Sequence, residues 1–199
     1  MKKTGSFVAV LLAILFVFGH SAPVAGAEWR FDPPHSSFRF AVKHIYSTVH
    51  GYFDDYSGTV NFEPDNLAAS KVNFKIKVDG IQTQVSQRDN HLRSPDFFDA
   101  GKYPYIVFDS TAITHAGGDH YEVAGKLTIK DVTRDIVLPF TYYGVKDHPA
   151  SPGDEVMGFD AAITLNRLDY HVGDGKFYRM GIVDKDVNVA VSVEMLRKK

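Results

Sequence analysis

Hydrophobic and polar residues alternate along most of this chain with a period of two, which is typical of β-strands that bury one face. The segment 71–78 is the clearest case, because Val72, Phe74, Ile76 and Val78 share one face while lysines lie on the other. A shift of one residue would bury those lysines, so the register is strongly specified. The same pattern predicts further strands over residues 29–31, 38–44, 52–62, 105–111, 121–129, 135–143, 157–165 and 187–195.

The stretch 83–98, TQVSQRDNHLRSPDFF, breaks this alternation and predicts a short helix over residues 85–92. Residues three and four apart share a helix face, so Val85, Asp89 and Leu92 are expected to project together. A mixture of charged and apolar residues is expected where a helix caps an apolar cavity. We keep two hypotheses for its charged groups: Arg88 and Asp89 pin the helix to the barrel rim, or they meet the polar end of a ligand.

About eight strands with one helical interruption indicate a closed antiparallel barrel or a sandwich. The difference matters for function, because a barrel of about eight strands can enclose a ligand whereas a sandwich fills its own interior. Periodicity alone leaves open whether the large inward side chains surround a cavity or fill a core.

The first 27 residues have the composition of a secretory signal peptide. Two lysines are followed by an apolar run over residues 7–18, and Ala25 and Ala27 are the small residues of an A-x-A cleavage site. The run is shorter than the about 20 residues that a membrane-spanning helix needs. We therefore expect a mature domain over residues 28–199, periplasmic or secreted after cleavage near Ala27, with no stable membrane insertion. The chain has no cysteine, so no disulfide framework is expected.

Charge and candidate chemistry narrow the function classes. Without Lys2 and Lys3 the chain has 20 basic and 24 acidic residues, a net charge of about −4, so no nucleic-acid partner is expected. Of the histidines after residue 27, only His115 and His120 lie close together in sequence, in a glycine-rich turn, so no metal site is predicted. Ser36 and His35 are neighbours in an extended segment and point to opposite faces, which excludes a serine–histidine pair there.

Several motifs, in this order along the chain, resemble the YceI-like family of exported polyisoprenoid-binding proteins. They include FAVKH ending at His44, RDNHL and DFFDA within residues 83–104, GKLTI at 125–129, and Asn166 with Arg167. The resemblance spans residues 28–194. It implies a lipocalin-like antiparallel barrel of about eight strands with one short helical segment inserted near residues 84–98. It also implies an apolar tunnel that holds, non-covalently, an isoprenoid such as a polyprenyl phosphate or an isoprenoid quinone.

An isoprenoid chain offers no hydrogen bonds, so its affinity must come from buried apolar area, about 0.8 kcal/mol per CH₂ group. We expect nine apolar residues to line the tunnel: Phe38, Phe40, Val42, Phe74, Ile76, Phe108, Leu127, Ile129 and Ile163. At the tunnel mouth we expect four polar residues to meet the head group: His44, Arg88, Asp89 and His91.

The sequence thus predicts an exported, non-catalytic protein that sequesters or transports an isoprenoid lipid. Two alternatives stay open at this point. One is an enzyme that acts on an isoprenoid or a quinone through Arg88, Asp89 and His91. The other is an interaction protein with a filled core, such as a soluble partner of a membrane redox system. The head group, the chain length, the pathway and the formation of a homodimer are also left open.

Overall fold

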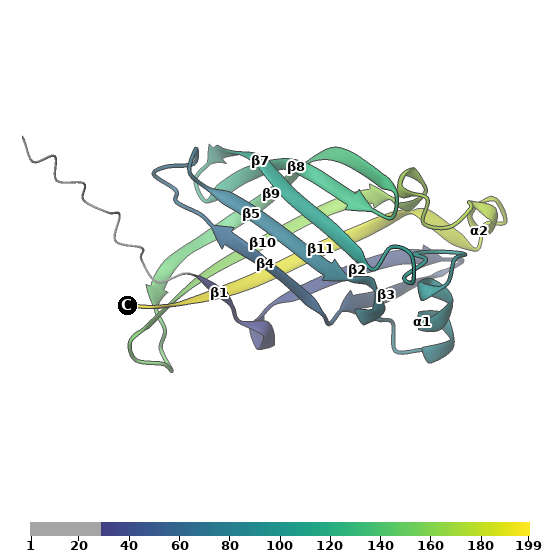
Figure 1. The fold of residues 1–199 in the computed structure, drawn as a ribbon, viewed down its shortest axis with the longest axis horizontal. Coiled ribbons are helices and arrows are strands. Elements are labelled where there is room, and N and C mark those ends of the chain that lie inside the picture. Colours follow the sequence, from purple (N-terminus) through teal and green to yellow (C-terminus); the bar gives the residue numbers. More distant parts are fainter. Residues whose placement is uncertain (1–28) are drawn as a thin grey trace, which may run out of the picture.

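The computed structural model describes residues 29–199, and their strands form one antiparallel sheet that curls into a barrel (Figure 1). The sheet order is β4-β5-β7-β8-β9-β10-β11-β2-β3-β6, with β1 paired to β11. The strands are β1 (Arg30–Phe31), β2 (Ser37–His44), β3 (Ser47–Phe53), β4 (Tyr56–Asn61), β5 (Lys71–Lys77), β6 (Ile81–Gln82), β7 (Tyr105–Gly117), β8 (His120–Ile129), β9 (Val132–Asp147), β10 (Asp154–Asn166) and β11 (Val183–Lys198). The predicted signal peptide, 1–27, lies outside the described residues and stays a prediction.

The two ends of the sheet meet through two continuous chain segments. One contains β3 and β4, and the other contains β5, the 3₁₀ turn Val78–Gly80 and β6; β4 pairs with β5, and β3 pairs with β6. Between these pairs, the Asp54 amide donates to the Gly80 carbonyl at 3.0 Å and the Lys77 amide donates to the Asp55 carbonyl at 2.9 Å. These bonds join the edges and leave a curled barrel with an interior.

The prediction of a lipocalin-like antiparallel barrel is confirmed, although strands β7, β9, β10 and β11 run longer than predicted and one predicted strand is divided in two. The sequence predicted one bent strand over residues 52–62, but Phe53 ends β3 and Tyr56 begins β4. At Asp54 and Asp55 the chain changes its pairing partner from β6 to β5, and this change breaks the strand. Residues 47–51 also belong to β3, where they pair with β2 in a hairpin that the alternation did not reveal.

The α-helices of the described chain lie at one end of the barrel (Figure 1). Helix α1 (Ser86–Arg93) confirms the predicted helix within one residue at each boundary. Helix α2 (Lys176–Arg179) is a single turn in the loop between β10 and β11 and was not predicted. Among the described residues, no helix has both the length and the apolar character that crossing a membrane requires.

The opposite end of the barrel is packed with aromatic rings. Phe62, which follows β4, lies at the centre of this cluster and is 5% exposed. Its ring centroid lies 4.8 Å from that of Tyr142, 5.1 Å from that of Tyr121, and 5.6 Å from those of Phe140 and Phe159. Edge-to-face contacts at such distances are favourable beyond the area they bury. We call these five residues the aromatic plug.

Candidate ligand-binding cavity

An apolar cavity of about 210 Å³ occupies the barrel between the aromatic plug and the helical end. Its wall contains side chains of nine strands, together with residues of α1, of the α1–β7 loop and of the β10–β11 loop. The lining consists of Phe38, Arg39, Phe40, Val42, Phe53, Phe74, Ile76, Ile81, Leu92, Phe97, Phe98, Ile106, Phe108, Leu127, Ile129, Ile136, Leu138, Ile163, Leu165, Arg167, Tyr170, Val172, Val183, Val187, Val189 and Val191.

The alternation of side chains along each strand determines which of them face the cavity. In β11, Val187, Val189 and Val191 alternate with outward residues and all three line the cavity. They are half-buried, whereas Val193 and Met195 further along the same face are 2% and 0% exposed. Inward side chains of one strand thus change from lining a cavity to filling a core.

Two glycines make room for aromatic rings in the cavity wall. A Cβ atom at Gly51 would lie 2.3 Å from Phe40 Cζ, and one at Gly125 would lie 2.5 Å from Phe108 Cζ. Both distances are far below van der Waals contact. The two phenylalanine rings therefore lie directly over the backbone of the neighbouring strand, which only glycine permits.

Helix α1 closes the cavity at the helical end. Leu92 of the helix and Phe97 and Phe98 of the following loop all belong to the lining. Arg93 anchors the C-terminal end of the helix, because its Nε donates to the Asp79 carbonyl at 2.9 Å and its Nη2 to the Ile81 carbonyl at 2.7 Å. The predicted arrangement, a short helix over an apolar cavity, is therefore present in the structure.

All nine apolar residues that the sequence singled out lie in the cavity wall: Phe38, Phe40, Val42, Phe74, Ile76, Phe108, Leu127, Ile129 and Ile163. Their contact with a lipid stays a prediction. The alternation identified them because an inward position on a barrel strand faces either the core or the cavity.

The predicted polar residues Arg88 and Asp89 are not part of the cavity wall. Asp89 is 5% exposed and accepts hydrogen bonds from the backbone amide of Thr83, at 2.8 Å, and from its hydroxyl. Arg88 Nε donates to the Thr83 hydroxyl oxygen, and Arg88 Nη2 donates to the Thr83 carbonyl, both at 2.7 Å. This is the geometry of the helix-pinning hypothesis, with Thr83 as the shared partner of both side chains.

His91 and His44 also lie outside the cavity wall. The ring of His91 packs edge-on against Phe97 at 4.9 Å between centroids, and its Nε2 lies 3.2 Å from the Asp96 carboxylate. His44 ends β2, opposite Val183 of β11. The part of all four polar residues in binding an isoprenoid stays a prediction.

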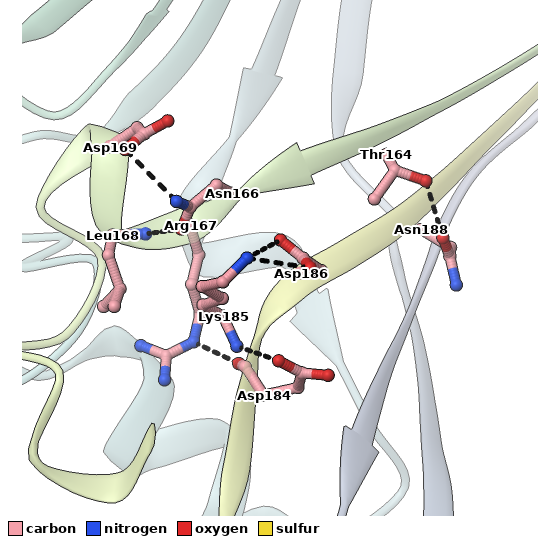
Figure 2. Close-up of polar contacts among 9 residues, drawn as sticks. All are labelled: Thr164, Asn166, Arg167, Leu168, Asp169, Asp184, Lys185, Asp186 and Asn188. Carbon is pink, nitrogen blue, oxygen red and sulfur yellow. Dashed lines mark hydrogen bonds and ion pairs between the residues drawn. The ribbon is translucent and has the colours of Figure 1, made fainter. Parts of the chain in front are cut away.

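Arg167 is a buried polar residue of the cavity wall that sequence reasoning missed. It begins the 3₁₀ turn Arg167–Tyr170. The Asn166 side chain caps this turn, because its oxygen accepts a hydrogen bond from the Leu168 amide at 3.1 Å (Figure 2). The Arg167 side chain is 8% exposed, and its Nε donates to the Asp184 carbonyl at 2.8 Å. Burial lowers the pKa of the guanidinium, but an arginine stays protonated in proteins. The motif Asn166-Arg167 was visible in the sequence, but the alternation of hydrophobic and polar residues along the chain did not indicate that Arg167 is buried.

One mixed cluster outside the cavity has the residue types of a metal site. Ligand atoms of Asp32, His35 and Glu194 lie within 4.8 Å of one another. The His35 Nδ1 atom lies 2.7 Å from Asp32 Oδ2, so these two groups already satisfy each other through a hydrogen bond. No metal is needed to explain their geometry.

The curled antiparallel barrel and its internal apolar cavity define a lipocalin-like protein with a site for a hydrophobic ligand. The model of the YceI-like domain matches residues 29–195. The chain belongs to the YceI-like family.

Relatives of known sequence and structure agree with this assignment. The chain is 32% identical to the protein YceI of Escherichia coli over 200 residues and 32% identical to a UPF0312 protein of Pectobacterium atrosepticum over 202 residues; each alignment covers 100% of both chains. The crystal structure of BcnA of Burkholderia cenocepacia has a TM-score of 0.74 at 28% identity, covering 82% of this chain and 98% of that one. A polyisoprenoid binding domain from Saccharophagus degradans shares the fold, with a TM-score of 0.62 at 14% identity, covering 87% of this chain and 99% of the other.

Proposed function

We propose that this protein is an exported carrier that holds an isoprenoid lipid in its barrel and does not transform it. The observation that carries the proposal is the cavity of about 210 Å³, whose wall is built almost entirely from aliphatic and aromatic side chains. Such a wall stabilises a bound ligand in proportion to the apolar area that is removed from water, by about 0.8 kcal/mol per CH₂ group. A structural relative of low identity is described as a polyisoprenoid binding domain, which supports the same ligand class.

The composition of the same wall supports binding without turnover. Within the described part of the chain, the cavity lining contains no serine, cysteine, histidine or carboxylate side chain that could serve as a nucleophile or a general base. The export step is supported by the predicted signal peptide, residues 1–27, and gives a carrier that works in the periplasm or outside the cell.

The size of the cavity sets a requirement on the ligand. Ligand sites in proteins commonly span about 300–1,000 Å³, so about 210 Å³ accommodates only part of a long chain. A full polyprenyl chain therefore requires lining side chains to move outward. Half-buried rings such as Phe40 and Phe74 are the groups that have room to do so.

Native mass spectrometry of the protein purified from the exported fraction tests the proposal, followed by organic extraction of anything released. We expect one isoprenoid molecule per chain. The Val189→Phe variant, whose added ring occupies part of the cavity, serves as the control for lipid adsorbed on the surface and should carry less lipid than the wild-type protein. A bare-chain mass, together with no binding when long-chain prenols and prenyl phosphates are titrated in, would overturn the proposal.

A further inference from the structure

Arg167 is a buried cation in an apolar wall, and only part of its hydrogen-bonding capacity is used. Besides the Nε bond to the Asp184 carbonyl, Nη1 donates to the Val172 carbonyl at 2.7 Å and Nη2 donates to the Val183 carbonyl at 3.4 Å. A guanidinium has five N–H groups, so one remains on each terminal nitrogen. Figure 2 shows these nitrogens pointing away from Asp184. Two N–H groups on the two terminal nitrogens are the fork that binds a phosphate or carboxylate in a bidentate manner.

The charge of Arg167 has no close counter-ion. Among the described residues, no carboxylate oxygen lies within the 4.0 Å of the guanidinium that defines an ion pair. Asp184 and Asp174 act on it only at longer range. The Asp184 carboxylate instead accepts from the Lys185 amide at 2.7 Å, and the Lys185 ammonium pairs with Asp186 at 2.9 Å (Figure 2). Backbone carbonyls satisfy hydrogen bonds of Arg167 but do not neutralise its charge, which an anionic ligand would do.

Arg167 also lies between the cavity and an outer groove of about 620 Å³. Its Nη1 is 2.5 Å from where a Cβ atom of Gly173 would be, and Gly173 belongs to the groove. The groove carries three basic residues, Lys130, Lys176 and Arg179, against the carboxylates of Asp96 and Asp174.

Lys130, a residue of the outer groove, brings a second cation close to Phe97. Its Nζ donates to the Phe97 carbonyl at 2.6 Å and to the His171 carbonyl at 2.7 Å. Phe97 lines the cavity, and the Arg167 guanidinium lies 5.9 Å from its ring centroid. Asp131 follows Lys130 in the chain, but its carboxylate is hydrogen-bonded to the His171 ring nitrogen at 3.1 Å. Phe97 is therefore close to two cations that backbone carbonyls hold: Arg167 in the cavity wall and Lys130 in the outer groove.

We propose that Arg167, assisted by Lys130, binds the acidic head group of an isoprenoid phosphate whose tail fills the cavity, an inference that rests on the proposed isoprenoid-binding function. The barrel then selects a prenyl phosphate over a neutral isoprenoid with the same tail. A quinone carbonyl could accept one of the free N–H groups, but it would leave the buried charge uncompensated. The phosphate oxygens satisfy both the fork and the charge.

A pair of probes with identical tails tests this selectivity: farnesyl monophosphate and farnesol, titrated into the full processed protein. We expect the phosphate to bind at least about tenfold more tightly than the alcohol, the difference that a charge-assisted bidentate contact supplies. In Arg167→Gln the preference should disappear, because the phosphate loses a charge-assisted contact that the alcohol never makes. Arg167→Lys should keep part of it, and Lys130→Met should reduce it by a smaller factor.

Arg134→Gln is the matched control. Arg134 donates to the Asp169 carbonyl at 3.0 Å, in the same 3₁₀ turn, but it lines neither the cavity nor the outer groove. Its loss removes one positive charge nearby and should leave the preference intact. Equal affinities of the wild-type protein for both probes would overturn the head-group assignment and leave the carrier function standing. The same conclusion would follow if Arg167→Gln weakened the binding of farnesyl monophosphate and of farnesol by the same factor. Binding of neither probe would overturn both. If Arg167→Gln does not fold, the wild-type ratio and the Lys130→Met ratio decide.

Discussion

The two ends of this barrel are built from the same strands and differ in how far their inward side chains are buried. At the aromatic plug, Phe62 contacts four other rings, and the void left there is about 50 Å³. Toward α1 and α2, the inward residues surround about 210 Å³. Protein interiors are normally packed as densely as organic crystals, so a void of this size lowers the stability of the folded protein, because its lining atoms lose packing contacts. We infer that one end holds the fold together and the other is left open for a ligand.

The largest effect that this comparison predicts is the loss of Phe62. Truncation in Phe62→Ala removes a ring from a fully packed site and should lower the free energy of unfolding by about 3–5 kcal/mol. The matched variant is Phe40→Ala, in which the lost ring already faces the cavity; we expect a smaller loss of about 1–2 kcal/mol. Urea unfolding of both variants measures the difference. Equal losses would show that the cavity end supports the fold as much as the plug does.

The next effect concerns the buried carboxylate of Asp89. Asp89→Ala leaves the Thr83 amide and hydroxyl without their acceptor and should lower the free energy of unfolding by about 2–3 kcal/mol. If the two ends are independent, hydrogen exchange should accelerate over residues 83–98 and stay unchanged around Phe140. Asp96→Ala is the control, because the Asp96 side chain is 76% exposed and should change stability by less than about 0.5 kcal/mol. Faster exchange at Phe140 as well would refute the independence of the two ends.

The third prediction concerns a variant that fills the cavity, whereas the first removed a ring from the core. Val189→Phe places a ring in the cavity and should lower isoprenoid affinity by about tenfold or more, or about 1.4 kcal/mol. The stability cost should stay below about 1 kcal/mol, because the ring enters an existing void. Ala190→Phe adds the same ring on the outward face of β11 and should leave the affinity unchanged. Titration of both variants with a long-chain prenol separates the two outcomes, and equal affinity in the two would place the ligand elsewhere.

The sequence was informative wherever one physical rule acted alone. Alternation in 71–78 and in 187–195 identified β5 and β11 because one face of each strand is inward, and the break at 83–98 identified α1. Alternation did not reveal β3, because residues 47–51 are mostly exposed and carry few apolar side chains. It also could not tell cavity from core, since Val189 and Val193 occupy equivalent inward positions on one strand.

The polar part of the site was harder to predict, because it depends on how the chain folds back on itself before α1 and between β10 and β11. Arg88 and Asp89 attracted attention as charges on a helix, but both bind Thr83, which precedes that helix in the chain. Arg167 had no such local signal. Its burial depends on carbonyls of Val172 and Asp184, which only the closed β10–β11 loop brings to the guanidinium.

The smallest predicted effect lies at the plug end, on the 3₁₀ turn Pro33–His35. The hydrogen bond that the His35 ring donates to the Asp32 carboxylate, together with the charge of that carboxylate, raises the pKa of His35 above its ordinary value of 6.5. A raised pKa means that the protonated pair stabilises the fold below pH 6.5, and this contribution is lost as the pH rises through the folded-state pKa. The effect is small because the imidazole is largely exposed to solvent.

An NMR titration of the His35 ring checks this prediction, with Asp32→Asn as the variant in which the pKa should return toward 6.5. The same pH series also tests the comparison between the two ends. His35 lies beside Asp32, whose amide donates to the Glu194 carbonyl next to the buried Met195, and neither His35 nor Asp32 is part of the cavity wall. The affinity for farnesol, which has no titrating group, should therefore stay constant while His35 loses its proton. An affinity that followed the His35 titration would mean that the packed end controls the cavity, because a local charge change at one end would then reach the ligand at the other.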